Sequence, residues 1–193
     1  MRKLTVGDIA DHRAYERERD AFRAYIIDMK RRRRIAVGDL ISIVFENTDT
    51  MRWQVQEMAR AERMLTDDAI ADEVATYNAL VPDDGELSGT LFVELTEDAK
   101  LREWLPKLVH VQHHVHFELA DGARVDAVPD DEERLTRDDV AATVHYLKFS
   151  FTPGQQHVFA TGPTRIVVDH PEYHAVAELT SEQRAELARD FSE

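Results

Sequence analysis

The hydrophobic pattern changes its period partway along the chain, and this change limits the possible folds more than any other feature. From about residue 8 to residue 80, apolar residues recur three or four positions apart, as on one face of a helix. From about residue 87 to residue 170, short runs rich in β-branched and aromatic residues alternate with turn signals, which is typical of strands. This order predicts a single α+β domain, with N-terminal helices packed on a mainly antiparallel sheet.

Three helices are expected in the first part of the chain. The first begins at a cap formed by Asp8 or Asp11 and runs to about Arg33. The second covers about residues 50–65 and follows a segment rich in helix-capping residues. The third covers about residues 67–80 and ends at a Pro-Asp-Asp-Gly turn signal.

The second part of the chain is expected to supply most of the strands, and one more is expected between the first two helices. They are predicted at about residues 40–45, 87–95, 115–119, 124–128, 140–151 and 165–169. Asp121-Gly122 predicts a hairpin between two of them. The segment 170–174 is expected to be a turn with exposed histidines, and a last helix is expected at about 181–189.

Composition excludes several kinds of protein. The chain has 24 Lys+Arg against 38 Asp+Glu, a net charge of −14, and no cysteine. Without cysteine, this chain forms no disulfide, thiolate nucleophile or iron–sulfur cluster held by its own cysteines. No apolar run approaches the roughly 20 residues of a membrane span, and no secretory h-region is visible, so a cytoplasmic protein is expected.

Common catalytic motifs are missing as well. The sequence contains no Gly-x-Gly-x-x-Gly, no phosphate-binding loop and no Gly-x-Ser-x-Gly elbow. No histidine follows a glutamate at the Glu-x-x-His spacing of ferritin-like di-iron proteins. These absences argue against a nucleotide hydrolase, a serine hydrolase and a rubrerythrin.

Several segments resemble a known bacterial family. They are Tyr15–Arg23, Lys30–Gly38, Val44–Thr50, Gln54–Arg63, Tyr77–Pro82, Thr90–Glu94 and Val144–Phe149. Together they resemble the family catalogued as domain of unknown function 3501, over most of the chain and most specifically from Phe45 to Arg63. The resemblance implies no established activity. Members are often encoded beside rubrerythrin and an iron–sulfur protein similar to heterodisulfide reductase, which implies a role near peroxide defence or electron transfer.

The densest group of polar residues surrounds the second helix. Its members are Glu46, Asn47, Asp49, Gln54, Glu57, Arg60 and Arg63. They are predicted to form one wall of a pocket or a partner surface, where Arg60 or Arg63 binds an anion. Glu57 and Arg60 are one turn apart and are expected to pair. The alternative is a capped surface helix with local ion pairs, each of which contributes little.

A basic run ends the first helix. It consists of Lys30, Arg31, Arg32, Arg33 and Arg34. Five adjacent cations can contact phosphates or an acidic protein partner. The net charge of −14 and the lack of an aromatic stacking pattern make nucleic acid an unlikely partner. In the alternative interpretation, these side chains fold onto acidic neighbours.

A group of histidines suggests a possible metal site. On a strand, His114, His116 and Glu118 share one face. Two imidazoles on one face can bind a divalent transition metal, and a third ligand is available from His145 or from His110, His170 or His174. His145 is itself expected to be buried. The alternatives are a solvated polar face and an adventitious site that takes up nickel or zinc during purification.

Three functions follow from these features. The first is an accessory or binding protein that works with a redox partner, a rubrerythrin or an iron–sulfur oxidoreductase, through residues 50–63 and 30–34. The second is a small metal-binding protein or metal-dependent enzyme. The third is a ligand-binding enzyme with Glu57 and Arg60 in a pocket between helix and sheet. The sequence leaves the oligomeric state open, and a homodimer is the commonest assembly in general.

Overall fold

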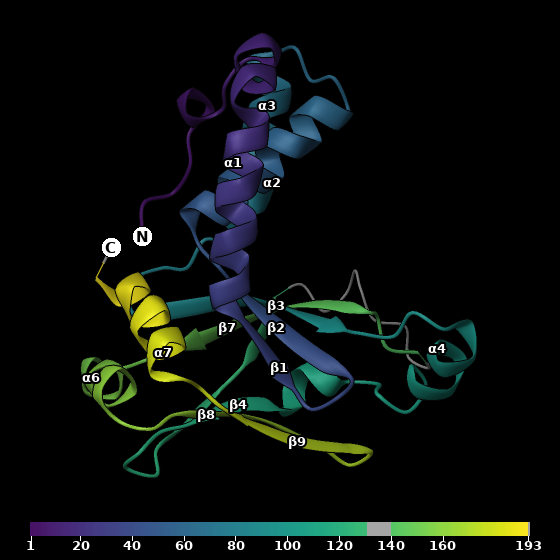
Figure 1. Ribbon diagram of the computed structural model, residues 1–193, viewed down its shortest axis with the longest axis vertical. Coiled ribbons are helices and arrows are strands. Elements are labelled where there is room, and N and C mark those ends of the chain that lie inside the picture. Colours follow the sequence, from purple (N-terminus) through teal and green to yellow (C-terminus); the bar gives the residue numbers. More distant parts are fainter. Residues whose placement is uncertain (131–139, 193) are drawn as a thin grey trace.

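The computed structural model describes residues 1–130 and 140–192, and it shows a helical arm that stands on a base of two sheets (Figure 1). The arm consists of α1 (His12–Arg33), α2 (Thr48–Ala61) and α3 (Asp67–Asn78). The shorter helices α4 (Asp98–Trp104), α6 (Pro153–Thr161) and α7 (Ser181–Ala188) belong to the base. Among the described helices, none combines the length and the apolar character needed to cross a bilayer.

Each helix of the arm begins at a residue that satisfies its free backbone N–H groups. Asp11 accepts hydrogen bonds from two backbone N–H groups of α1, and Asn47 accepts one from Thr50 of α2. Thr66 does the same for α3. The three predicted helices are therefore confirmed, although α2 begins two residues earlier and ends four residues earlier than expected.

The first sheet lies at the foot of the arm. Its strand order is β1 (Arg34–Val37), β2 (Ile41–Glu46), β3 (Glu86–Val93), β7 (Val144–Ser150) and β6 (Val128–Asp130), and all neighbours are antiparallel. The second sheet has the order β5 (Arg124–Asp126), β4 (Val115–Glu118), β8 (Arg165–His170) and β9 (Tyr173–Glu178), again antiparallel. The predicted α+β class is confirmed, but the strands form two sheets where one was expected.

The main core lies between the two sheets. Phe45 and Phe149 of the first sheet contact Phe117 of the second, with ring centroids 5.7 and 4.9 Å apart. All three rings are completely buried. Phe159 of α6 and Phe191, in the 3-10 turn after α7, extend the aromatic cluster towards the C-terminus. Burial of these rings together with the aliphatic residues around them stabilises the base.

The opposite face of the first sheet carries the arm. Because side chains alternate along a strand, the odd-numbered residues of β2, β3 and β7 enter the main core and the even-numbered ones face the arm. A second apolar cluster joins the two parts, with Met51 and Val55 of α2 packed near Val74 of α3 and Tyr146 of β7. The even-numbered residues beneath the arm form the candidate site.

Several predicted boundaries and exposures are wrong. Arg34 was expected to end the first helix, but it is the first residue of strand β1. Residues 170–174 were expected to be a turn, but strand β9 begins at Tyr173. Helix α6 was not predicted. His170 was expected to be exposed, but it is buried, and its Nε2 lies 3.0 Å from the carbonyl oxygen of Val109.

Candidate functional site

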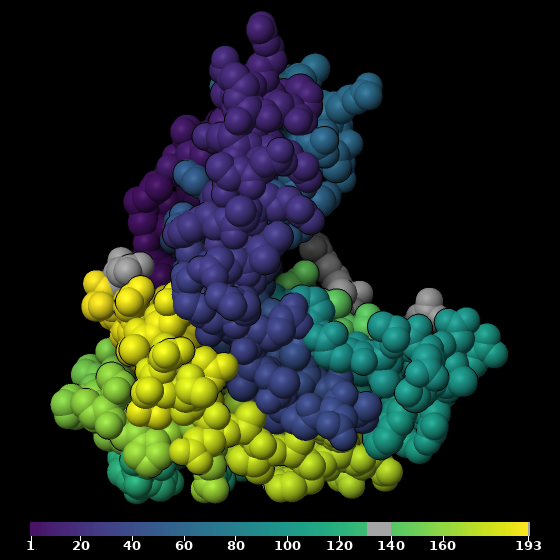
Figure 2. Space-filling model, viewed as in Figure 1, coloured from purple at the N-terminus to yellow at the C-terminus, as the bar shows by residue number. Residues whose placement is uncertain are grey.

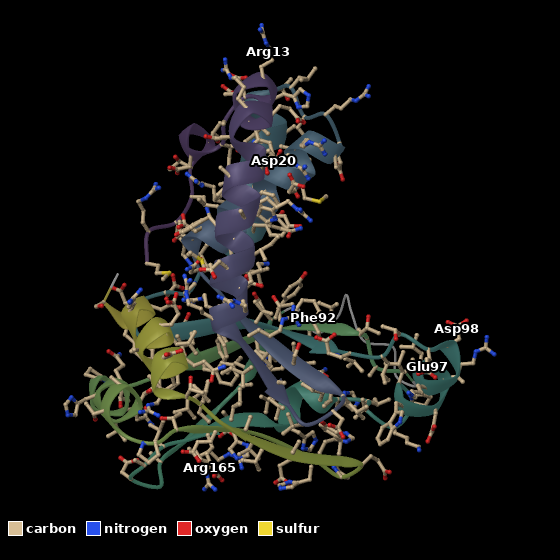
Figure 3. The ribbon with its side chains drawn as sticks, viewed as in Figure 1. Arg13, Asp20, Phe92, Glu97, Asp98 and Arg165 are labelled. Carbon is tan, nitrogen blue, oxygen red and sulfur yellow. The ribbon has the colours of Figure 1, made fainter. Side chains whose placement is uncertain are left out.

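The pairing of three strands brings polar residues together under the arm. Thr90 of β3 lies directly opposite Tyr146 of β7, and it is the diagonal neighbour of Glu46 on β2. All three side chains are on the face that α2 and α3 cover. Figure 3 shows Phe92, which shares this face of β3, at the foot of the arm.

These residues line a cavity of about 260 Å³ between the arm and the first sheet. Its polar lining is Lys30, Glu46, Gln54, Tyr77, Thr90 and Tyr146, and its apolar lining is Met51, Leu80, Phe92 and Val144. The end of α1, both other arm helices and three strands contribute to it. The volume lies just below the range of roughly 300–1,000 Å³ that is usual for ligand pockets, so the cavity suits a small molecule.

Glu46 is the most unusual residue of this cavity. Its side chain is only 4% exposed. The carboxylate oxygen Oε1 accepts a hydrogen bond of 2.8 Å from the Thr90 hydroxyl. The other oxygen, Oε2, has no hydrogen-bond partner among the described residues, and the Lys30 ammonium lies 3.7 Å from it. An unpaired buried acceptor costs about 1–3 kcal/mol, and more when it is charged.

Two phenols, those of Tyr77 and Tyr146, line the cavity. Burial raises the pKa of Tyr146, and the nearby Tyr77 and Glu46 raise it further. The Tyr77 hydroxyl accepts a long hydrogen bond of 3.4 Å from Gln54 Nε2. No described residue hydrogen-bonds to the Tyr146 hydroxyl, so this group and Glu46 Oε2 both lack a hydrogen-bond partner among the described residues.

Arg33 positions the backbone on which Glu46 sits. Its Nε donates to the carbonyl of Phe45 at 2.8 Å, and its Nη2 donates to the carbonyl of Glu46 at 3.2 Å. The guanidinium is 1% exposed and forms an ion pair with Asp190, which is 2% exposed. The end of β2 is thereby tied to α1 and to the C-terminal segment.

Two of the predicted site residues face a different cavity. Asn47 and Asp49 line a polar cavity of about 250 Å³ beside α1 and α7. Asn47 caps α2, and its amide nitrogen lies 3.4 Å from the sulfur of Met29. Asp49 accepts a hydrogen bond of 2.8 Å from the Tyr25 hydroxyl. These contacts give both residues a structural role.

Glu57 and Arg60 do not form the expected pair. Glu57 accepts hydrogen bonds from the Tyr15 hydroxyl at 2.7 Å and from two nitrogens of Arg19 at 2.7 and 2.8 Å. Arg60 instead contacts Glu16 at 2.5 Å. Both bridges join α2 to α1, because α1 is long enough to offer partners that the sequence of α2 alone does not show.

Arg60 and Arg63, the two arginines of the polar group predicted around the second helix, lie towards the tip of the arm. Arg60 lines a cavity of about 460 Å³ between the N-terminal segment and α2, whose lining does not include Glu57. Arg63 is exposed and has a positive φ of 53° after the end of α2. None of the cavities found among the described residues is lined by both Glu57 and Arg60.

The basic run is distributed over several acidic partners. Arg31 and Arg32 both pair with Asp28, and Arg32 also approaches Glu186 at 3.4 Å. Arg34 pairs with Glu94 at 2.6 Å, and Arg33 with Asp190. The alternative interpretation, in which these side chains fold onto acidic neighbours, describes this arrangement. Lys30 differs from the others because it faces the cavity of Glu46.

The histidines predicted as metal ligands do not gather at one point, although the rings of His114 and His170 are 4.9 Å apart. His116 of the second sheet is buried, and burial lowers its pKa. His114 contacts the carbonyl of Asp169 at 3.0 Å. His145 lies in the first sheet, buried as expected, with Nε2 2.9 Å from the carbonyl of Ala142 and a pKa lowered mainly by burial. Within residues 1–130 and 140–192, no three His, Asp or Glu side chains are grouped so as to hold a metal ion.

Sequence reasoning placed Glu46 and Gln54 in one predicted pocket wall, but it assigned Lys30 to the separate basic run. Tyr77, Thr90 and Tyr146 were missed altogether. A signal was present, since polar residues alternate with apolar ones in both predicted strands that carry Thr90 and Tyr146. The pairing of those strands, which brings the residues together, is not visible in one sequence.

The chain is similar to proteins whose function is unknown. The family model described as "Protein of unknown function (DUF3501)" matches residues 3–191. A crystal structure described as a novel protein of unknown function from Burkholderia pseudomallei K96243 has 31% sequence identity and a TM-score of 0.84. That match covers 97% of this chain and 95% of the other. No curated protein matches the chain.

Proposed function

The chain belongs to the DUF3501 family of proteins of unknown function, and we propose that it is a binding protein for a small polar molecule held by Glu46. The ligand occupies the cavity between the arm and the first sheet. It donates a hydrogen bond to Oε2 of Glu46, and the Tyr146 hydroxyl and the Lys30 ammonium supply donors in return.

The observation that carries this proposal is the oxygen of Glu46 that accepts no hydrogen bond. A buried carboxylate with a purely structural role is usually satisfied at both oxygens. Glu46 lines the cavity, and its Oε1 is satisfied by Thr90, whereas its Oε2 is buried and has no hydrogen-bond partner among the described residues. Proteins tolerate such a cost mainly at functional sites, where a ligand completes the missing contact.

The test is a thermal-stability screen of wild type and Glu46→Gln. The compounds are small amines, amino acids, amides, carboxylates and sugars. A ligand present at about 100 times its Kd stabilises the folded state by about 2.7 kcal/mol, which raises the Tm by roughly 5–10 °C. We expect such a shift in wild type and little or none in Glu46→Gln.

Glu57→Gln is the matched control. Glu57 is also a carboxylate between arm helices, but its oxygens are bound by Arg19 and Tyr15, and it does not line the cavity. The control must retain the shift of wild type. If no compound stabilises wild type more than it stabilises Glu46→Gln, the proposal is wrong.

We also propose that this binding protein works beside a redox partner, as its family resemblance implies. The chain has no cysteine, so any thiolate or cysteine-ligated cluster chemistry of such a pair would belong to the partner. Affinity capture from extracts of the source bacterium is expected to recover a rubrerythrin or an iron–sulfur oxidoreductase. Repeated captures without a redox protein above background would contradict the association.

A further inference from the structure

We propose that the ligand of the Glu46 cavity is a small zwitterionic amino acid with an apolar side chain. Its ammonium group binds Oε2 of Glu46, and its carboxylate binds the ammonium of Lys30. This inference rests on the proposed function, because it assigns a chemical class to the molecule that the same cavity holds.

The first argument is the charge of the cavity lining. Among the described lining residues, one anion, Glu46, faces one cation, Lys30, and no other lining residue is Asp, Glu, Lys or Arg. A ligand that is only an amine or only an acid leaves a net charge in a site where Glu46 is desolvated, which is costly. A zwitterion offers an ammonium group to Glu46 and a carboxylate to Lys30, and it adds no net charge.

The second argument is the incomplete contact between the two poles. Glu46 Oε2 and the Lys30 ammonium are 3.7 Å apart, which is too long for a hydrogen bond. The ammonium of Lys30 donates no hydrogen bond to any described residue, and Oε2 accepts none. Lys30 is 29% exposed and has a flexible stem, so it can move to admit a ligand between the two charges.

The third argument is the remainder of the lining. Met51, Leu80, Phe92 and Val144 give the cavity an apolar wall that suits an aliphatic or aromatic side chain. The Tyr146 hydroxyl stays protonated and offers a donor to the carboxylate of the ligand. The volume of about 260 Å³ restricts the ligand to a single small molecule and excludes a peptide.

Calorimetric titration of the full chain with matched probes tests the inference. The probes are glycine, alanine, valine, leucine, methionine and phenylalanine. Leucine is compared with 3-methylbutylamine, which lacks its carboxylate, and with 4-methylpentanoate, which lacks its ammonium. We expect at least one apolar amino acid to bind, and the leucine-type zwitterion to bind about tenfold or more tightly than either fragment.

Two variants test which charged group of the ligand Glu46 and Lys30 each bind. In Glu46→Gln, the preference for leucine over 4-methylpentanoate is expected to disappear, because the partner of the ammonium is lost. In Lys30→Gln, the preference for leucine over 3-methylbutylamine is expected to disappear. Arg31→Gln is the matched cation control, since Arg31 lies next in the same helix but is exposed and pairs with Asp28. Circular dichroism and the Tm verify that each variant is folded.

The outcomes separate this inference from the proposed function. If no amino acid binds, but other compounds bind in a manner that depends on Glu46, the zwitterion is wrong and the binding function holds. If amino acids bind equally to wild type and to both variants, they occupy another site and the inference is wrong. If nothing stabilises or binds wild type in preference to Glu46→Gln, both proposals are wrong.

Discussion

Glu46 illustrates how one side chain can be poorly suited to stability and well suited to binding. Replacing it with Gln retains an oxygen that accepts from Thr90 and removes a buried charge that only Lys30 balances. We therefore expect Glu46→Gln to lie within about 1 kcal/mol of wild type in free energy of unfolding, or above it, because functional residues are often not optimal for stability. Urea denaturation measures this difference.

Thr90→Val is the informative comparison for that experiment. It is nearly isosteric, but it removes the donor to Oε1 and leaves both buried oxygens of Glu46 without a hydrogen bond. It should cost about 1–3 kcal/mol. A larger loss in Glu46→Gln than in Thr90→Val would mean that the carboxylate is a structural group.

Glu57 is predicted to give the arm a dependence on pH. The hydrogen bonds from Arg19 and, after the opposing effect of burial, from Tyr15 lower the pKa of Glu57. A lowered pKa in the folded state means that the stabilisation is present above the unfolded pKa, about 4.3, and is lost as the pH falls through the lower folded value. Glu57→Gln should cost about 1–2 kcal/mol at pH 7, and this cost should shrink progressively as the pH falls below about 4.3.

The measurement is the free energy of unfolding of both proteins from pH 7 to pH 3. Other carboxylates titrate in both proteins and cancel from the difference. A difference that stays constant over this range would contradict the assignment of the pH dependence to Glu57.

At the scale of the residue, the sequence predicts which side chains carry chemistry better than it predicts which of them meet. Glu46 stands out because it is charged at the end of an apolar strand, and Gln54 because it is polar beside an apolar helix face. Their neighbour Tyr146 lies 100 positions further along the chain from Glu46. Its position depends on the pairing of β3 with β7, which is a long-range property.

At the scale of the element, the predicted helix and strand boundaries were wrong where two sequence patterns overlap and only one of them was interpreted. The cations of residues 30–34 were interpreted as one helix end, but the alternating burial of Arg34–Val37 belongs to strand β1. Pro171 indicated a turn, so strand β9, which begins two residues later, was not predicted. Helix α6 had a readable signal, with Thr152 as its cap, Pro153 in its first turn and Gln155 completing a capping box.

The hairpin between β1 and β2 offers a test of how an element depends on one glycine. Gly38 has a φ of +70°, and a Cβ placed there would collide with the Tyr173 hydroxyl. That hydroxyl donates to the carbonyl of Val37 at 2.6 Å and accepts from the N–H of Leu40 at 3.2 Å. Gly38→Ala should therefore cost about 3 kcal/mol or more, because backbone strain, the collision and lost hydrogen bonds add together.

Gly122→Ala is the matched control in the hairpin between β4 and β5. Gly122 has a φ of +84°, but nothing lies within 4 Å of its added Cβ, so only the backbone strain of about 1–2 kcal/mol is expected. Chemical denaturation compares the two. The excess cost of Gly38→Ala should shrink in a Tyr173→Phe background. Equal losses in the two alanine variants would show that the contact with Tyr173 is unimportant.

At the scale of the whole molecule, the arm and the base meet around Arg33. This residue ends α1, and the chain then enters β1 of the base. Its guanidinium contacts the end of β2 and Asp190 near the C-terminus, so three distant parts of the chain share one buried cation. Figure 2 shows the C-terminal segment packed against the foot of α1, the region in which Arg33 and Asp190 form their ion pair.

Removing the anion of this pair should destabilise arm and base together. Asp190→Ala removes the buried carboxylate of this pair and leaves Arg33 with the more distant Glu186, 3.7 Å away, and breaking a buried pair typically costs about 3–5 kcal/mol. The two tryptophans report the two parts separately, Trp53 in α2 of the arm and Trp104 in α4 of the base, once each is studied with the other replaced by Phe. Both fluorescence transitions should move to lower urea concentration by the same amount. Asp126→Ala, which removes an exposed partner of Arg124, should change stability by less than about 1 kcal/mol. If only one tryptophan transition moved in Asp190→Ala, Arg33 would stabilise one part alone and the coupling of arm to base would have to lie elsewhere.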